Sequence, residues 1–133
     1  METLRLSGRD FSLMLRIHDN LWCRIALKRG QELTELGAEV FEIFLDKLEN
    51  AISDKRYNEY TRTVSSFTLF DKNVCWLATL SETLCSLYVT KDSHSTYIYI
   101  LNREAEYVDT LKLTTRQCEQ WMEKMSSWRL KIS

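Results

Sequence analysis

The spacing of apolar residues changes twice along this chain of 133 residues, and that change constrains the fold more than any other feature. Apolar and polar residues alternate from Thr3 to Lys28, which is typical of half-buried strands. After Gly30 the apolar residues recur every three or four positions, as on one face of an amphipathic helix. The same succession returns between Thr61 and Leu130. The spacing therefore predicts an α+β fold in which antiparallel strand meanders are each followed by a helix.

The first half of the chain is predicted to form three strands and one long helix. Turn-forming residues at 7–10 and 18–20 separate the strands, because their side chains tolerate left-handed backbone or bond to it. The predicted strands are 3–6, 11–17 and 21–28, and the predicted helix is 34–53. The apolar stripe of this helix comprises Leu33, Leu36, Val40, Phe41, Phe44, Leu45, Leu48 and Ile52.

The second half repeats this order with more strands. Its predicted strands are 61–70, 74–80, 84–90, 96–101 and 107–113, and its predicted helix is 115–130. Thr114 and Gln117 fit the capping-box pattern at the start of that helix. A short strand that ends in Leu-Thr precedes each of the two helices. We therefore interpret residues 1–133 as a single domain that contains a degenerate repeat, ββββα twice, over residues 1–57 and 58–133.

Composition narrows the class of protein further. The chain has no proline and only three glycines, so no flexible linker divides it. No apolar run is long enough for a signal peptide or a membrane span, which predicts an intracellular protein without a membrane partner. The four cysteines lack the spacing of a metal site, and we expect free thiols in a reducing compartment. A disulfide or a zinc site is the alternative.

Residues with catalytic or metal-binding chemistry are sparse. The two histidines, His18 and His94, both fall in predicted turns, away from clusters of cysteine or carboxylate. The chain contains no nucleophile elbow, no phosphate loop and no HExxH pattern. We therefore expect a protein that is not an enzyme and that uses no cofactor and no metal.

Charge is distributed unevenly along the chain, although the formal net charge is only −1. Residues 1–31 hold six basic residues against three acidic ones, so the predicted first sheet is positive. Residues 32–54 hold seven acidic residues and a single basic one, Lys47, so the predicted first helix is negative. The strands and the helix of the first half therefore differ in sign.

The alternation of side chains along a strand predicts which residues share the open face of the first sheet. Phe11, Leu13 and Leu15 should point into the core, whereas Met14 and Arg16 should point outward. A basic face with an exposed tryptophan suits single-stranded nucleic acid, because cations follow the phosphates and a flat ring stacks on an unpaired base. The predicted nucleic-acid-binding residues are Arg5, Arg9, Met14, Arg16, Trp22, Arg24, Lys28 and Arg29. Secondary candidates in the second half are Tyr97, Tyr99, Lys72, Lys91, Arg103 and Lys112.

The two helix entries share a pattern of Leu-Thr followed by aromatic residues. It comprises Leu33, Thr34, Phe41 and Phe44 in the first half, and Leu113, Thr114 and Trp121 in the second. With the short strands before it, this pattern resembles the fold shared by the transcriptional coactivator PC4, the PUR-repeat proteins and the plant Whirly proteins. The resemblance implies that single-stranded nucleic acid binds on a curved sheet with the helix behind it, and that two such units pair as in a dimer. The glycine-rich turn and the basic spacing of PUR repeats are absent here.

These observations predict a non-catalytic protein that binds single-stranded DNA or RNA, as a cofactor of transcription or replication and with a homodimer as a further option. The alternative is a protein-interaction module or chaperone-like dimer, motivated by the near-neutral charge and by Trp76, Trp128, Tyr97 and Tyr99. In that case the basic face is ordinary solvated surface or covers a partner. A third interpretation, a pleckstrin-homology-like binder of lipid or peptide, fits poorly because a helix separates the two groups of strands.

Overall fold

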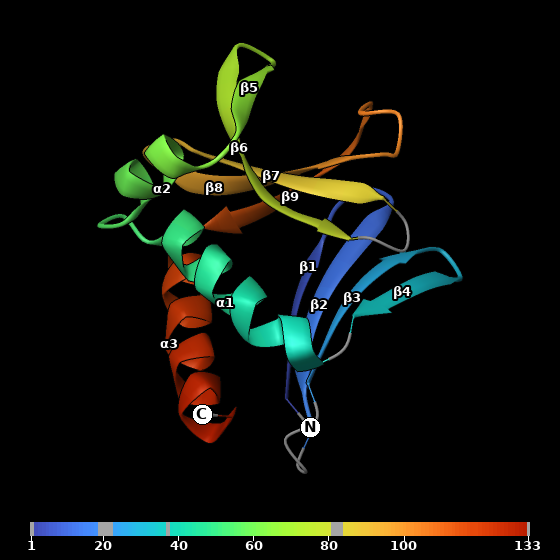
Figure 1. Ribbon diagram of the computed structural model, residues 1–133, viewed down its shortest axis with the longest axis vertical. Helices are drawn as coiled ribbons and strands as arrows, with labels where there is room; N and C mark the ends of the chain where they lie inside the picture. The colour runs from blue at the N-terminus through green and yellow to red at the C-terminus, as the bar shows by residue number, and fades with distance from the viewer. Residues whose placement is uncertain (1, 19–22, 37, 81–83, 133) are drawn as a thin grey trace.

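The described part of the chain forms two antiparallel sheets and three helices, which confirms the α+β class (Figure 1). The computed structural model describes residues 2–18, 23–36, 38–80 and 84–132. The first sheet has the order β1 (Glu2–Ser7), β2 (Phe11–Ile17), β3 (Cys23–Arg29) and β4 (Glu32–Leu36). The second has the order β5 (Ser66–Leu69), β6 (Lys72–Leu80), β7 (Cys85–Lys91), β8 (Ser95–Leu101) and β9 (Tyr107–Thr114). The helices are α1 (Ala38–Ile52), α2 (Tyr57–Thr63) and α3 (Thr115–Ile132).

The helices α1 and α3 lie beside each other in the space between the two sheets, and the second sheet lies across one end of the first (Figure 1). Both helices bury their apolar sides in one core, to which both sheets contribute. The ring of Phe41 in α1 packs 6.0 Å from the ring of Trp128 in α3, measured between centroids. Trp128 Nε1 also donates a hydrogen bond of 2.6 Å to Glu2, so the last helix is tied to the first strand. The core therefore unites the two halves of the chain.

A buried carboxylate joins the two sheets at the turn between β1 and β2. Asp109 of β9 accepts hydrogen bonds from the backbone N–H groups of Arg9, Asp10 and Phe11, at 3.0, 2.9 and 2.7 Å. Gly8 comes so close that a Cβ atom there would lie 2.5 Å from the Asp109 carboxylate. The turn therefore needs glycine at this position because of the close approach, and it places the end of β1 against β9.

The boundary between the first sheet and the first helix differs from the prediction. Residues 34–36 were expected to be helical, but Glu32–Leu36 forms β4, which pairs with β3 through Lys28 and Leu33, among others. The helix begins at Ala38. Leu33 and Leu36 are three residues apart, a spacing that suits a helix, but pairing with the edge of β3 makes this segment a strand.

The segment before the second sheet also differs from the prediction. The strand predicted at 61–70 is wrong for residues 61–63, which belong to α2, and β5 is confined to Ser66–Leu69. Tyr60 of this short helix is buried, and its hydroxyl donates a hydrogen bond to the backbone carbonyl of Trp76. A contact with a residue in β6 therefore stabilises a helix that the local spacing does not indicate.

The other predicted elements agree with the structure to within two residues where it describes them, and residues 21 and 22 of the strand predicted at 21–28 lie outside the described residues. The capping box is confirmed: Gln117 Oε1 accepts a bond of 2.9 Å from the N–H of Thr114, and Thr114 Oγ1 accepts one of 3.2 Å from the N–H of Gln117. The ββββα repeat is not confirmed, because the second sheet has five strands and α2 precedes it. None of the helices in the described part of the chain combines the length and the apolar character needed to traverse a bilayer.

Candidate nucleic-acid interface

The outward face of the first sheet carries three cationic side chains on adjacent strands. Arg5 of β1 pairs with Met14 of β2, and Lys28 of β3 pairs with Ser12 of β2, so these positions share the face that also includes Arg16. Arg5 and Lys28 are exposed, and Arg16 is half-buried. The helices α1 and α3 lie on the other side of this sheet (Figure 1). The predicted basic face is therefore present for these three residues.

Met14 lies on this face but is only 4% exposed, so the expectation that its side chain is presented at the surface is wrong. Its sulfur accepts a hydrogen bond of 3.3 Å from Arg16 Nη2. Long charged side chains often cover apolar neighbours with their aliphatic stems while the charged groups stay in water. We infer that Met14 supports the arginine and does not itself form part of the binding surface.

Of the four further predicted residues, two lie off the basic face, one is in register with it and one lies outside the described residues. Arg29 points to the opposite face from Lys28, and its guanidinium lies 5.5 Å from the centroid of the Phe11 ring, so its assignment to the basic face is wrong. Arg9 lies in the turn between β1 and β2 and is exposed there, off the sheet face. Arg24 belongs to β3 and pairs with Arg16 through the backbone. Trp22 lies outside the described residues.

An aromatic surface covers the outward face of the second sheet, and the sequence indicated it only in part. Ile98 and Ile100 of β8 are in the main core, so Tyr97 and Tyr99 are the outward pair. Tyr99 is buried in a second, smaller apolar cluster, against which Tyr97 packs. The members of this cluster are Val74, Tyr99 and Leu101, with Phe67, Leu69, Tyr88 and Tyr97 partly buried around them. The signal for it in the sequence is the alternation of aromatic residues along neighbouring strands.

Tyr97 is the point at which this aromatic surface meets positive charge. Lys72 Nζ lies 4.6 Å from the centroid of its ring, and Lys112 Nζ lies 5.9 Å away. Such contacts between cations and aromatic rings hold lysine side chains over the ring without neutralising them. Of the secondary candidates, Tyr97, Tyr99, Lys72 and Lys112 therefore share one surface, whereas Arg103 is exposed in the turn after β8.

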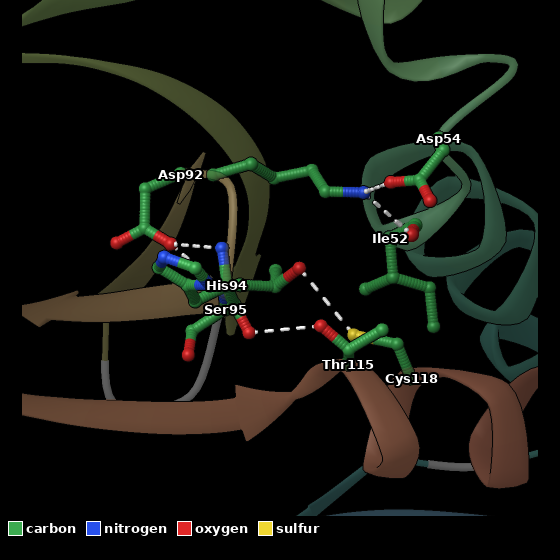
Figure 2. Close-up of polar contacts among 9 residues, drawn as sticks. Ile52, Asp54, Asp92, His94, Ser95, Thr115 and Cys118 are labelled. Carbon is green, nitrogen blue, oxygen red and sulfur yellow. Dashed lines mark hydrogen bonds and ion pairs between the residues drawn. The ribbon is translucent and has the colours of Figure 1, made fainter.

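Lys91, the remaining candidate, belongs to a groove of about 480 Å³ between the end of α1, the β7–β8 turn and the start of α3. Its ammonium group bonds to Asp54 at 2.7 Å and to the carbonyl of Ile52 at 2.8 Å (Figure 2). Across the groove Cys118 Sγ donates to Thr96 Oγ1 at 3.4 Å. Lys91 is therefore occupied by contacts within the protein.

The cysteine in this groove is not activated. Burial raises the pKa of the Cys118 thiol, so the thiol stays protonated at neutral pH and reacts slowly. Thr115 donates a hydrogen bond of 2.9 Å to the backbone carbonyl of His94, which ties the start of α3 to the β7–β8 turn (Figure 2). Within residues 2–18, 23–36, 38–80 and 84–132, no group of three or more His, Cys, Asp or Glu residues is placed to hold a metal ion. These contacts fasten α3 to the second sheet.

Comparisons of the chain with models of protein families, with curated proteins and with solved structures found no match. The candidate interface is therefore defined by its own residues. Its parts are the basic face, which we define as Arg5, Arg16 and Lys28 on the first sheet, and the aromatic surface of the second sheet with Lys72 and Lys112 beside Tyr97.

Proposed function

We propose that this protein binds single-stranded DNA or RNA along the outward faces of its two sheets. The observation that carries the proposal is the basic face, where Arg5, Arg16 and Lys28 stand together on the side of the first sheet opposite the helices. Exposed acidic residues of α1, such as Glu42 and Asp46, belong to the helical side. This separation of charge favours a polyanion on the sheet and away from the helices.

The aromatic surface favours a single strand over a duplex. Stacking on a protein side chain requires a base whose face is free, and each stacked base contributes about 1–3 kcal/mol. Tyr97 carries two lysines beside its ring, so a base and its phosphate could be held at the same place. Charge alone would serve duplex and single strand alike, and the aromatic rings therefore determine the preference.

The arrangement of the elements supports the same proposal. The order β1–β2–β3–β4–α1 resembles the unit of four strands and a helix found in PC4, the PUR-repeat proteins and the Whirly proteins. We infer that the second half is a modified copy of this unit, with one additional strand and α2. A role inside the cell as a cofactor of transcription or replication belongs to the proposal, which involves no catalytic step.

The proposal is tested by the fluorescence anisotropy of labelled oligonucleotides of one sequence, prepared as single-stranded DNA, single-stranded RNA and duplex DNA. We expect at least one of the single strands to bind more tightly than the duplex. Binding should weaken as salt rises, because cations on the protein displace counterions from the phosphates. No binding at low salt, or binding that is insensitive to salt, would overturn the proposal.

A double variant, Arg5→Ala with Lys28→Ala, locates the binding surface. Each lost phosphate contact should reduce the slope of log affinity against log salt by about 0.7 for a single strand. The slope of the double variant should therefore be smaller than that of the parent by about 1.4. The matched control is Lys55→Ala with Arg116→Ala, which removes two exposed cations from the helical side. Equal losses in the two variants would show that net charge, and no particular face, governs binding.

A further inference from the structure

The turn between β5 and β6 has an unusual composition for its backbone shape. Leu69 pairs with Lys72, so Phe70 and Asp71 are the only residues in the loop. Both have left-handed backbone, with φ of 52° and 61°. This pair of positive angles is typical of the type I′ hairpin turn, which strongly favours Asn-Gly and similar pairs. A bulky phenylalanine in this conformation costs stability, because its Cβ crowds the backbone.

The phenylalanine gains little burial in return. Phe70 is 59% exposed, and its ring meets that of Tyr107 edge to face at 5.0 Å between centroids. Tyr107 is itself 42% exposed, and its hydroxyl shares a hydrogen bond of 2.6 Å with Thr110. Strained backbone persists where the surrounding structure imposes it, and such sites are concentrated where ligands bind. The turn therefore presents two exposed aromatic rings at a cost to folding.

The surroundings of these two rings suit a nucleic acid. Lys72 follows the turn directly and lies over Tyr97, to which Lys112 is also close. Tyr107 pairs with Leu101, which belongs to the aromatic surface, so the two rings lie on the outward face of the second sheet. The rings thus share this face with the two lysines.

We propose that Phe70 and Tyr107 form a stacking site for one unpaired base of the bound strand, and this inference rests on the proposed function. The base would lie against the exposed ring of Phe70, while an adjacent phosphate faces Lys72. The site is selective for a flat, unpaired base and does not depend on its sequence, because every base offers a π face. It extends the interface along the outward face of the second sheet.

The test compares Phe70→Asn with Phe70→Tyr, using the oligonucleotide and the anisotropy assay described above. Asparagine removes the ring but accepts the left-handed backbone, and Asp71 keeps its charge. We expect Phe70→Asn to bind about tenfold more weakly, as the loss of one stacked base requires, and Phe70→Tyr to bind within about twofold of the parent. The salt slope of both variants should equal that of the parent, because no phosphate contact is removed.

Ala105→Gly is the matched control for relaxation of the backbone. Ala105 is exposed, has a φ of 60° and lies in the turn before β9, but offers no ring. Glycine there relieves a similar strain and should leave affinity unchanged. Far-ultraviolet circular dichroism and melting curves of all three variants check the fold. We expect Phe70→Asn to melt within about 3 °C of the parent, because relief of strain offsets the lost ring contact.

Three outcomes would overturn the stacking site. The first is a folded Phe70→Asn variant whose affinity equals that of the parent. The proposed function would remain intact in that case if the double variant of Arg5 and Lys28 still shows a reduced slope of log affinity against log salt. The second is a reduced salt slope in Phe70→Asn, which would assign the loss to phosphate contacts. The third is that light scattering shows the parent to be a dimer, and that the Phe70→Asn substitution dissociates this dimer without loss of oligonucleotide binding. Failure of the parent to bind any strand would instead refute the proposed function.

Discussion

Replacing Asp109 by asparagine should detach the β1–β2 turn from β9 and thereby weaken the junction of the two sheets. One carboxylate oxygen accepts the N–H groups of Arg9 and Thr110, at 3.0 and 2.8 Å. The other accepts those of Asp10 and Phe11, at 2.9 and 2.7 Å. An asparagine side chain keeps a single oxygen, so its NH₂ group would face two backbone donors that have no acceptor.

The expected loss follows from these two donors. A buried donor left without a partner costs about 1–3 kcal/mol, so two of them cost roughly 2–6 kcal/mol. Movement of the exposed part of the turn toward water should reduce this, and we expect a loss of about 3 kcal/mol in the free energy of unfolding. For a chain of this length such a loss lowers the melting temperature by roughly 10 °C.

The effect should depend on pH in a direction that the surroundings of Asp109 determine. Burial by itself raises the pKa of this carboxyl, but the backbone N–H groups of Phe11, Arg9, Asp10 and Thr110 outweigh burial, and the pKa is lowered. A carboxyl whose pKa is lower in the folded protein stabilises it above the pKa of the unfolded chain, near 3.8. That stability is lost as pH falls through the folded pKa.

The assay is thermal and urea unfolding, followed by circular dichroism, from neutral pH down to the acid limit of the folded state. The stability gap between the parent and Asp109→Asn should be widest at neutral pH and should narrow in acid. Asp10→Asn makes the same chemical change at an exposed neighbour and should alter stability by less than about 0.5 kcal/mol. A gap under about 1 kcal/mol at neutral pH, or one that does not narrow in acid, would refute this account of the junction.

Three other substitutions test separate contacts. Gly8→Ala should cost about 2 kcal/mol, because the new Cβ would meet the Asp109 carboxylate, and a double-mutant cycle with Asp109→Ala should remove most of this cost. Tyr60→Phe should cost about 1–2 kcal/mol in urea unfolding, since it leaves the Trp76 carbonyl without its donor. Burial raises the pKa of Glu49 against the opposing charge of Arg129, so stability decreases as pH rises through that pKa. Glu49→Gln should therefore match or exceed the parent at neutral pH, and any gain should vanish in acid. A loss of more than about 1 kcal/mol at neutral pH would contradict this.

Local patterns in the sequence determined the elements whose backbone partners lie nearby. The strand at Phe11–Ile17 was predicted with its observed bounds, because its alternation of apolar and polar residues matches the two faces of a half-buried strand. The capping box at Thr114 and Gln117 was equally visible, since its two hydrogen bonds join residues three positions apart. The alternation also placed Arg16 and Lys28 on one face of the first sheet.

Contacts between distant parts of the chain decided the remainder. The bonds from Asp109 to the β1–β2 turn span about a hundred residues, and no periodicity within a window of ten or fifteen residues can indicate them. Pairing with β3 made residues 32–36 a strand, although the spacing of their leucines suits a helix. Met14 alternates outward as predicted, yet its neighbours bury it. Phe70 and Tyr107, finally, meet only because the sheet brings the β5–β6 turn to the start of β9, and the proposed stacking site exists only in the folded molecule.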